Sequence, residues 1–465
     1  MNPRVVVSGI DSSTQSCKAL TVDAETGEIL ARASAAHPDG TAVDVRHWWQ
    51  ALQDCSPDGF SASAAVSVSA QQHGLVALGA DGKPVYDALL WNDTRSAPQA
   101  AHLREQFGAE WWAEQIGVVP VPSFTITKLA WLAQHEPATA DRTATILLPH
   151  DWLTWKLAGM PESPTTDRSD ASGTGYFSVP ENRYRTDLVQ EVFGKVPKLP
   201  KVLAANETAG RTATGALLAA GCGDNAGAAL GLGLQPGEVA VSIGTSGTVF
   251  TSTPQPVADP SGAVAGFADA TGQNLPLLAT INAARILSGT AQLLGVDLPE
   301  FDRLAGAGPL DAGGLTLVPY FDGERTPNLP DAHGTLLGMS RANLTPENLA
   351  RTAVLGLLCM LADALDSLRS QGIAANRVLL IGGGSKAASV RNAAADILAT
   401  EILVPEPEEY VALGAARQAA WALSGDPEPP QWERRISTSS EPTHPEWATE
   451  VRGRFARAKE LLYGI

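Results

Sequence analysis

The sequence predicts an α/β protein with two domains. The chain has 465 residues, more than one ordinary hydrophobic core accommodates, and its 44% apolar and 18% charged residues are typical of globular proteins. Segments 5–23 and 239–250 share one pattern, in which a β-branched strand leads through a small, hydroxyl-rich turn into a second strand. Elsewhere strand patterns alternate with amphipathic helices. We place the domain boundary near Leu218, giving domains 1–218 and 219–465 without a low-complexity linker.

The composition indicates which kinds of molecule the protein could bind. The net charge of -17 argues against nucleic-acid backbones and anionic membranes, but not against a nucleotide, whose phosphates bind to local backbone N–H groups and Mg²⁺. The chain begins without a signal-peptide pattern, and no apolar run approaches the roughly 20 residues that span a bilayer. We therefore expect a soluble cytoplasmic protein. Four dispersed cysteines indicate neither a disulfide framework nor a zinc site: Cys17, Cys55, Cys222 and Cys359.

The first 33 residues predict a β-meander with strands over 5–11, 18–23 and 28–33. Asp11 ends the first strand, where a buried carboxylate is costly unless it meets a cation or several donors. A metal or phosphate role and a structural turn carboxylate both remain open for it.

A second copy of this pattern opens the other half of the chain at 239–250. Turns of this kind expose consecutive N–H groups that can cradle phosphate oxygens. One such turn is weak support, because Gly-Ser-Thr hairpins are common. Two of them suggest a duplicated domain with a nucleotide between the halves.

Two polar corners follow apolar strands in the first half. A strand over 64–70 runs into Gln72 and His73, whose amide and imidazole groups suit a polyol, although a histidine bonded by local backbone is the plainer alternative. The second corner combines a tryptophan ring with polar groups, which suits a sugar but also occurs in ordinary cores. Its residues are Trp91, Asn92 and Asp93.

Periodicity and helix-end signals predict most of the helices. Asp151 is expected to cap the helix that starts at Trp152, Thr345 to cap the helix 346–371, and the polar segment 165–174 to form a loop near a site. The other predicted helices span 98–108, 110–116, 125–135, 389–398 and 446–462, with a further small-residue helix from Ala412.

A glycine-rich turn follows the predicted strand 377–381 and precedes the helix 389–398. Its residues Gly383, Gly384 and Ser385 place N–H groups near a helix N-terminus, which favours an anion or a nucleotide. The spacing fits neither the dinucleotide fingerprint nor the P-loop. A plain strand-to-helix turn is the alternative.

The small-residue segment 220–227 holds a single carboxylate, Asp224, followed by Asn225. Glycines allow a ligand to approach closely, so Asp224 could serve as a general base for a hydroxyl. A cap on the following helix is the structural alternative.

Over essentially the whole chain these motifs resemble the FGGY carbohydrate kinases. Gly9-Ile-Asp11-Ser-Ser-Thr14 resembles the family's first phosphate hairpin, usually G-I-D-x-G-T, with Ser12 and Ser13 replacing the usual residues. The segment 123–135 fits the family's first signature at every constrained position, and Gly223-Asp224-Asn225 matches the segment of the catalytic base. Further matches are Ser242-Ile-Gly244-Thr245-Ser-Gly247, Gly382-Gly-Gly-Ser385, Trp91-Asn-Asp93, Ser169-Asp-Ala-Ser-Gly173 and Gly323-Glu-Arg-Thr-Pro327.

The resemblance implies two actin-like, ribonuclease H-like domains around a central cleft, and transfer of the γ-phosphate of ATP to a sugar hydroxyl. Asp224 would be the general base, and Asp11, with Asp224, would hold Mg²⁺. The implied nucleotide residues are Thr14, Gly244, Thr245, Gly383, Gly384 and Ser385. The implied sugar residues are Gln72, His73, Trp91, Asn92, Asp93 and Asn225.

Within this family the motifs are most similar to the enzymes that phosphorylate D-xylulose, although Gln72 stands where the family often has Met. L-ribulose, gluconate and glycerol remain alternative substrates. An actin-like ATPase without a sugar substrate shares the implied fold, and a non-catalytic sugar sensor is disfavoured because Asp11 and Asp224 are both present. The resemblance also suggests a homodimer.

Overall fold

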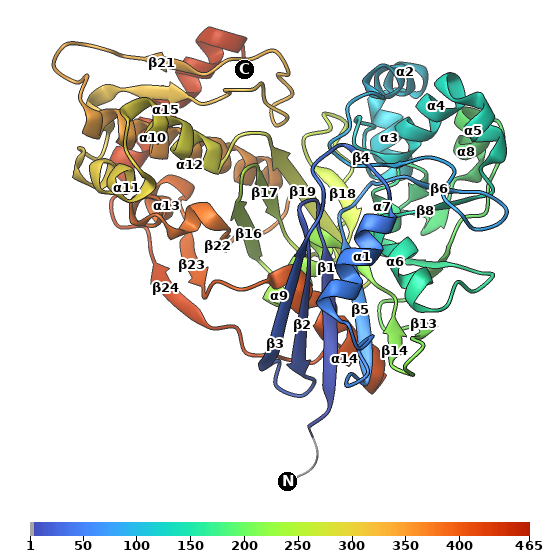
Figure 1. The fold of residues 1–465 in the computed structure, drawn as a ribbon. Coiled ribbons are helices and arrows are strands. Elements are labelled where there is room, and N and C mark those ends of the chain that lie inside the picture. Colours follow the sequence, from blue (N-terminus) through green and yellow to red (C-terminus); the bar gives the residue numbers. More distant parts are fainter. Residues whose placement is uncertain (1–3) are drawn as a thin grey trace. The chain divides into compact units, whose positions relative to one another are not determined.

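The computed structural model describes residues 4–465, which form two compact α/β units (Figure 1). Unit 1 consists of residues 4–233, Ser252–Pro276 and Glu408–Arg434, and unit 2 of Leu234–Thr251, Leu277–Pro407 and Arg435–Ile465. The predicted α/β class is confirmed. The boundary predicted near Leu218 falls inside a strand, and the division into 1–218 and 219–465 stays a prediction.

The main sheet of unit 1 has the strand order β13-β14-β5-β1-β2-β3, with β15 also paired to β5. β1 runs antiparallel to β2 and parallel to β5, so the predicted meander is confirmed. The strands are β1 (Val6–Ser12), β2 (Ser16–Asp23), β3 (Ile29–Ala36), β5 (Ala65–Ala70), β13 (Thr208–Arg211), β14 (Leu217–Ala219) and β15 (Cys222–Gly223).

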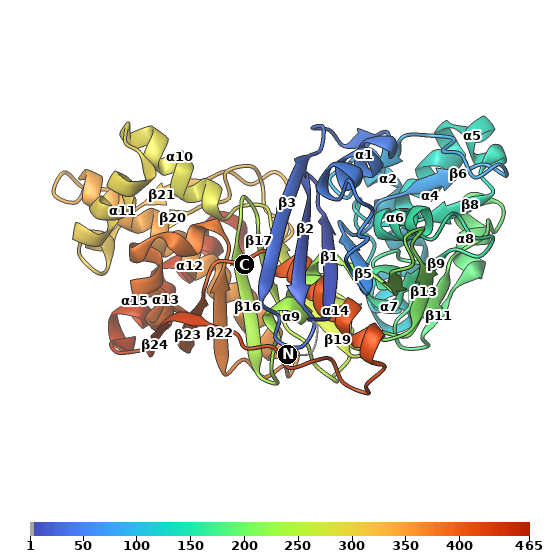
Figure 2. The same cartoon turned by 60° about the horizontal axis from the view of Figure 1, so that its bottom comes forward.

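Helices cover both faces of this sheet. Ile10 and Val68 share a core with Trp48 of α1 and Trp152 of α6 on one face, whereas Val7 packs against α14 on the other. Figure 2 shows α14 crossing the blue strands β1 to β3. The helices of unit 1 are α1 (Arg46–Cys55), α2 (Ala97–Phe107), α3 (Ala109–Ile116), α4 (Thr125–His135), α5 (Pro137–Arg142), α6 (Pro149–Leu157), α7 (Arg168–Ser172), α8 (Thr186–Phe193), α9 (Asp224–Leu232) and α14 (Tyr410–Ser424).

Short strands complete unit 1. They pair as β4 with β7, β6 with β8, β9 with β12 and β10 with β11. Their bounds are β4 (Ala42–Val43), β6 (Val76–Leu78), β7 (Ala88–Leu89), β8 (Thr145–Leu147), β9 (Thr165–Asp167), β10 (Phe177–Ser178), β11 (Arg183–Tyr184), β12 (Lys201–Leu203) and β18 (Ala265–Ala268).

Unit 2 is built on a sheet with the order β19-β17-β16-β22-β23-β24. The strands of this sheet are β16 (Glu238–Ile243), β17 (Gly247–Phe250), β19 (Asn274–Thr280), β22 (Arg377–Ile381), β23 (Glu401–Pro405) and β24 (Ile436–Ser440). A separate pair is formed by β20 (Thr316–Val318) and β21 (Thr335–Leu337). The helices of unit 2 are α10 (Ala284–Leu294), α11 (Leu298–Ala307), α12 (Pro346–Ser370), α13 (Ala388–Leu398) and α15 (Pro445–Tyr463), with 3₁₀ turns η1 (Ala312–Gly314) and η2 (Gly383–Lys386).

The two sheets repeat one topology. In each, the first strand is antiparallel to the second and parallel to the fourth: β1 with β2 and β5, and β16 with β17 and β22. Numbered in chain order within each unit, both sheets contain the run 3-2-1-4, which is β3-β2-β1-β5 in unit 1 and β19-β17-β16-β22 in unit 2. The duplication inferred from the two strand–turn–strand segments is confirmed.

Three local expectations need correction. Asp151 is not the N-cap of its helix: α6 begins at Pro149, and the Asp151 carboxylate accepts the Leu148 N–H (2.8 Å) from inside the first turn. Segment 165–174 is not an irregular loop, since it holds β9 and α7, whose first turn is capped by the Asp167 carboxylate. Asp224 is the first residue of α9 and not its N-cap, which is Gly223.

Within residues 4–465, one helix is long and apolar enough to cross a membrane by length and composition. This helix is α12, and 89% of its most apolar window is buried inside the structure. It packs against α10, α11 and α13 of unit 2, which identifies it as a core helix. The cap predicted at its start is confirmed, because Thr345 Oγ1 accepts the Asn348 N–H.

Candidate active site

The two carboxylates predicted to do the chemistry stand at the same end of the unit 1 sheet. Asp11 on β1 and Cys222 on β15 are both in register with Ser69 of β5, which lies between them. Neighbouring strands are about 4.8 Å apart, so the ends of β1 and β15 lie about 10 Å apart, and Asp224 follows Cys222 by two residues. The sheet register therefore brings Asp11 and Asp224 together.

Burial raises the pKa of both carboxyl groups. Loss of hydration raises the pKa of Asp11 to about 6, against the hydrogen bond from Ser13 Oγ and the positive charge of Lys18. The pKa of Asp224 rises to about 7, first through burial and then through the negative charge of Asp11. Asn225 opposes this rise, donating its backbone N–H and its Nδ2 to Asp224 Oδ1, each at 2.8 Å.

Buried polar atoms without hydrogen-bond partners, among the residues that the structure describes, lie at the ends of β1 and β5, the strand that bears Asp11 and its parallel neighbour. They are the hydroxyls of Ser12 and Ser69 and both side-chain polar atoms of Gln71. Gln71 follows β5 directly, and its N–H donates to the Ser12 carbonyl (3.2 Å). Buried polar groups normally have partners. Their concentration at the strand end that bears Asp11 fits a hydrated cation, since hard oxygen donors are what Mg²⁺ prefers.

The first polar corner is tied to the catalytic segment. Asn225 Nδ2 lies 3.5 Å from Gln72 Oε1, and Gln72 Nε2 donates to the Ser169 carbonyl (3.2 Å). His73 has a left-handed backbone (φ 69°), packs beside Phe124, and holds its Nδ1 2.7 Å from the Gly173 carbonyl. Backbone bonding of His73 is thus present, and its contact with a sugar stays a prediction.

The second polar corner joins a predicted sugar residue to a predicted phosphate residue. Trp91 Nε1 donates to Thr14 Oγ1 at 2.8 Å, so Trp91 fixes the side chain of the first hairpin. Asn92 Oδ1 is buried without a partner in the part of the chain that the structure describes. Asp93 is only 3% exposed, and this burial by itself would raise the pKa of its carboxyl. The hydrogen bonds from Arg95 Nε (2.8 Å), the Arg95 N–H (3.1 Å) and Thr41, together with the charge of Arg95, outweigh burial and lower the pKa.

In unit 2 the predicted nucleotide residues lie at the ends of two neighbouring parallel strands. Ser242 of β16 is in register with Ile381 of β22, so the turn holding Gly244 and Thr245 lies beside η2. A Cβ on Gly384 would meet Ile243 Cγ2 at 2.3 Å, which shows how tightly the two loops pack.

The helix end proposed as an anion site in unit 2 is already occupied. The carboxylate of Asp302 accepts the N–H groups of Ala388 and Ser389 (2.9 and 2.8 Å) and so caps α13. In contrast, Gly383 is exposed, with no atom within 4 Å of a Cβ built there. Space for a ligand in this loop is therefore at Gly383 and not at the start of α13.

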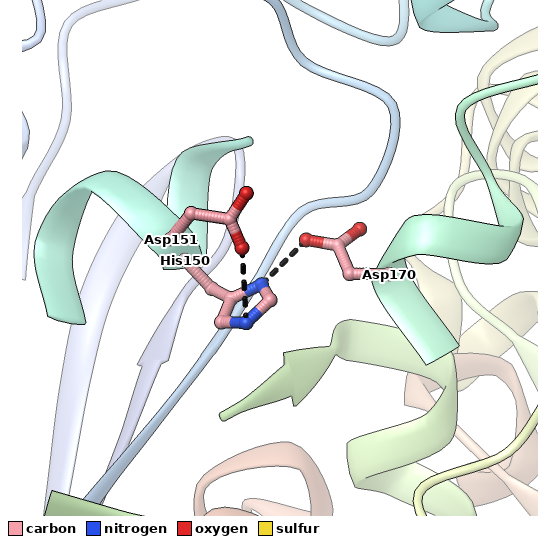
Figure 3. A group of neighbouring side chains, drawn as sticks. All are labelled: His150, Asp151 and Asp170. Carbon is pink, nitrogen blue, oxygen red and sulfur yellow. Dashed lines mark hydrogen bonds and ion pairs between the residues drawn. The ribbon is translucent and has the colours of Figure 1, made fainter. Parts of the chain in front are cut away.

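A buried group of four titratable side chains that sequence reasoning missed lies behind Asp224. His150 Nδ1 is 2.6 Å from Asp170 Oδ2, and His150 Nε2 is 3.3 Å from Asp151 Oδ1, as Figure 3 shows. Asp167 Oδ1 is 3.9 Å from the same Nε2. Burial alone would lower the pKa of His150, but the three carboxylates outweigh it and raise that pKa to about 9.

The sequence held only an indirect signal for this cluster. The Ser169–Gly173 motif was matched to the family without a role, and Asp151 was assigned only to helix capping. The four members come from α6, β9 and α7, and no local pattern joins those segments. Gln71 was likewise passed over beside Gln72 and His73.

The geometry suits proton abstraction from a hydroxyl. A carboxylate whose pKa lies near 7 is ionised in part at neutral pH and is a stronger base than an ordinary aspartate. It stands beside a second carboxylate, buried oxygens that fit a cation, and two polar corners.

The N-terminal domain of the FGGY family of carbohydrate kinases matches residues 6–232, and the C-terminal domain of that family matches residues 239–423. The xylulose kinase of Streptomyces rubiginosus is 43% identical over 455 residues, which cover 94% of this chain and 92% of that protein. The xylulose kinase of Streptomyces coelicolor is 44% identical over 438 residues, which cover 90% of this chain and 89% of that protein.

Among solved structures, the xylulose kinase from Bifidobacterium adolescentis matches with a TM-score of 0.90 at 44% identity. The match covers 98% of this chain and 99% of that chain. The family matches span most of both units, and these relatives align over nearly their whole length. The chain therefore belongs to the FGGY family of carbohydrate kinases and is an enzyme of that family.

Proposed function

We propose that this kinase transfers the γ-phosphate of ATP to the terminal hydroxyl of D-xylulose, giving D-xylulose 5-phosphate. The observation that carries the proposal is the pairing of Asp224 with Asp11 at the ends of strands flanking β5, with the pKa of Asp224 raised to about 7. Family membership supports ATP as donor, and the names of the closely similar relatives support D-xylulose as acceptor.

In the proposed reaction the sugar oxygen attacks the γ-phosphorus while the bond to the β–γ bridging oxygen breaks and ADP leaves. The hydroxyl proton passes to the Asp224 carboxylate. Most of the rate enhancement in such transfers comes from positioning and charge neutralisation, and the base contributes a smaller share. Asn225 holds Asp224 Oδ1 through two hydrogen bonds, which fixes the direction from which the carboxylate meets the hydroxyl.

The residues around Asp11 fit a magnesium ion. Asp11, with Asp224, would hold it directly or through water, and the unpartnered hydroxyl of Ser69, which is in register with Asp11, would bond a water ligand. Bound Mg²⁺ neutralises phosphate charge. Thr14 in unit 1, and in unit 2 Gly244, Thr245, Gly383, Gly384 and Ser385, are the proposed nucleotide residues.

The proposed sugar residues all belong to unit 1: Gln72, His73, Trp91, Asn92, Asp93 and Asn225. The unpartnered Oδ1 of Asn92 supports this assignment, because a buried amide oxygen needs a donor and a sugar hydroxyl supplies one. Gln72 donates from Nε2 to the Ser169 carbonyl and accepts at Oε1 from Asn225 Nδ2. It therefore helps to fix Asn225, the residue that follows the proposed base.

The decisive experiment measures ADP release from Mg-ATP with D-xylulose, D-ribulose, L-ribulose, gluconate and glycerol in parallel. It compares the wild type with Asp224→Asn, which keeps the size of the side chain. We expect D-xylulose to give the highest kcat/KM, and the variant to lose about 10²- to 10⁴-fold in kcat, the usual range for a general base.

Faster turnover with another polyol would keep the kinase and reject D-xylulose. ATP hydrolysis at full rate without sugar and unaffected by Asp224→Asn would reject the mechanism in favour of an actin-like ATPase. Circular dichroism and a melting curve of the variant establish that it is folded.

We also propose a cytoplasmic location and a homodimer. The four cysteines are buried free thiols, as is usual in a reducing compartment. Sedimentation of the purified protein would settle the oligomeric state.

A further inference from the structure

Helix α7 contacts both residues of the first polar corner, Gln72 and His73. The carbonyl of Ser169 accepts from Gln72 Nε2 (3.2 Å), and the Gly173 carbonyl at the helix end is 2.7 Å from His73 Nδ1. The hydroxyl of Ser169 accepts the N–H of Gly223 at 3.1 Å. Gly223 directly precedes Asp224. One five-residue helix is therefore bonded both to the sugar corner and to the segment that carries the base.

The helix is too short to hold its own position. Five residues form little more than one turn, so its stability must come from tertiary contacts. Locally, the Asp167 carboxylate caps the helix through the N–H groups of Ser169 and Asp170. The tertiary contact is that of the Asp170 side chain with His150 at 2.6 Å (Figure 3). The contact between the His150 ring and the Asp170 carboxylate is fully buried and joins α7 to α6, which makes this pair the side-chain anchor of α7.

The same histidine also contacts the catalytic segment. A Cβ added to Gly221 would lie 2.4 Å from His150 Cδ2, so the imidazole ring packs directly on the backbone three residues before Asp224. On its other side Gly221 exchanges two hydrogen bonds with the Gln418 side chain (3.0 and 2.9 Å). His150 thus contacts the backbone at Gly221, and Ser169 bonds the backbone at Gly223, so both ends of the segment 221–223 are held.

We propose that Ser169 and the His150–Asp170 pair are positioning residues that set the place of Asp224 relative to the sugar corner. The proposal rests on the assignment of Asp224 as the base. The Ser169 hydroxyl acts on Gly223, while its carbonyl acts on Gln72, so removing the hydroxyl alone displaces the base and leaves the sugar contact. The result is a loss of kcat with an unchanged KM for the sugar.

A matched pair of substitutions tests this. Ser169→Thr and Ser169→Val add nearly the same bulk to a fully buried site, but only the threonine variant keeps the hydroxyl. Any packing damage is therefore shared, and the difference between the two variants reports on the hydrogen bonds of the hydroxyl, to the Gly223 N–H and to the Asp167 carboxylate. We expect kcat with D-xylulose to be on the order of 100-fold lower in Ser169→Val than in Ser169→Thr, as for a misplaced catalytic group, with sugar KM values alike.

The control is Ser172→Ala on the same helix. Ser172 is also fully buried, and its hydroxyl donates to the Ser169 carbonyl (2.6 Å) and accepts the Ala268 N–H (3.0 Å), but it has no bond to Gly223. A merely structural role of α7 predicts that Ser172→Ala loses as much kcat as Ser169→Val. That outcome would overturn the proposal, as would equal kcat values in Ser169→Thr and Ser169→Val.

A second measurement needs no substrate. Hydrogen exchange followed by mass spectrometry, over peptides that contain Gly223, should show about tenfold faster exchange in Ser169→Val than in Ser169→Thr, because the amide loses its acceptor. If the wild type prefers another sugar, the proposed substrate fails while this comparison still decides the role of Ser169. Equal exchange in the Ser169→Thr, Ser169→Val and Ser172→Ala proteins would overturn the role of the hydroxyl.

The His150–Asp170 pair is tested by Asp170→Asn, which keeps the shape of the side chain and replaces its carboxyl group with an amide. We expect a fall in kcat that exceeds any change in sugar KM, and faster exchange at Gly223. An unchanged kcat in a folded Asp170→Asn protein would remove the pair from the proposal.

Discussion

At the scale of single residues, Lys128 is the clearest case of an ionisable group buried where its charged form is disfavoured. It is fully buried in α4, and its ammonium group donates to the carbonyls of His73 (3.3 Å), Pro122 (3.4 Å) and Ser123. Burial lowers the pKa of Lys128 to about 7, and the negative charge of Asp93 only partly opposes this. Lys128 thereby fixes the backbone of His73, a predicted sugar residue.

Replacing this lysine with methionine should change how stability depends on pH. An unfolded lysine has a pKa near 10.4, so between about pH 7 and 10 the unfolded wild type binds more protons than the folded state. The free energy of unfolding of the wild type should then rise with pH relative to Lys128→Met, by at most about 1.4 kcal/mol per pH unit. Urea unfolding of both proteins at pH 7, 8 and 9 measures the difference. Parallel curves would contradict a lowered pKa.

At the scale of elements, the catalytic segment depends on how closely α9 packs on α14. A Cβ on Gly414 of α14 would lie 1.8 Å from the carbonyl oxygen of Gly227 and 2.8 Å from the backbone nitrogen of Gly231. The small-residue runs in both helices thus allow backbone to meet backbone. Because α9 begins at Asp224, this contact fixes the direction in which the helix presents the base.

Gly414→Ala should therefore destabilise the protein and lower kcat. Neither neighbour is a flexible side-chain end, so the helices must separate, at a cost of roughly 3 kcal/mol or more. The matched control is Gly306→Ala in α11, where an added Cβ meets nothing within 4 Å. That substitution should be neutral or stabilise by up to about 1 kcal/mol, the helix preference of Ala over Gly. Denaturant unfolding compares them, and equal effects would refute the close contact.

Elements with strong local signals could be predicted from the sequence. β22 spans the predicted Arg377–Ile381, and α4 the predicted Thr125–His135, because a β-branched run and an amphipathic helix stopped by Pro137 are local features. α7 could not be predicted in this way. Its polar, glycine-punctuated sequence resembles a loop, and the helix exists because Asp167 caps it and His150 meets Asp170.

At the scale of the whole molecule, the repeated strand–turn–strand pattern predicted the duplicated topology, since it marks the first two strands of each sheet. The position of Asp11 and Asp224 followed from the family motifs, and the register of β1, β5 and β15 gives its physical reason. The buried cluster around His150 could not be found in the sequence, because tertiary contacts bring its members together from separate segments. Sequence alone also did not reveal that Asp302 occupies the start of α13.

The proposed sugar residues lie in unit 1 and most of the proposed nucleotide residues in unit 2. Substitutions of two adjacent glycines, Gly383 and Gly384, test whether the unit 2 loop binds the nucleotide. Gly383 has open space around an added Cβ, whereas Gly384 would place one 2.3 Å from Ile243 Cγ2. If ATP lies against this loop, Gly383→Ala should raise the KM for ATP about tenfold, by roughly 1.4 kcal/mol of lost binding, without changing the melting temperature or the KM for the sugar. Gly384→Ala should lower the melting temperature as well, because the hairpin after β16 must move. Steady-state kinetics at saturating sugar and a thermal melt of both variants separate a glycine that a ligand needs from one that the fold needs. A Gly383→Ala protein with an unchanged KM for ATP would exclude this loop from nucleotide binding.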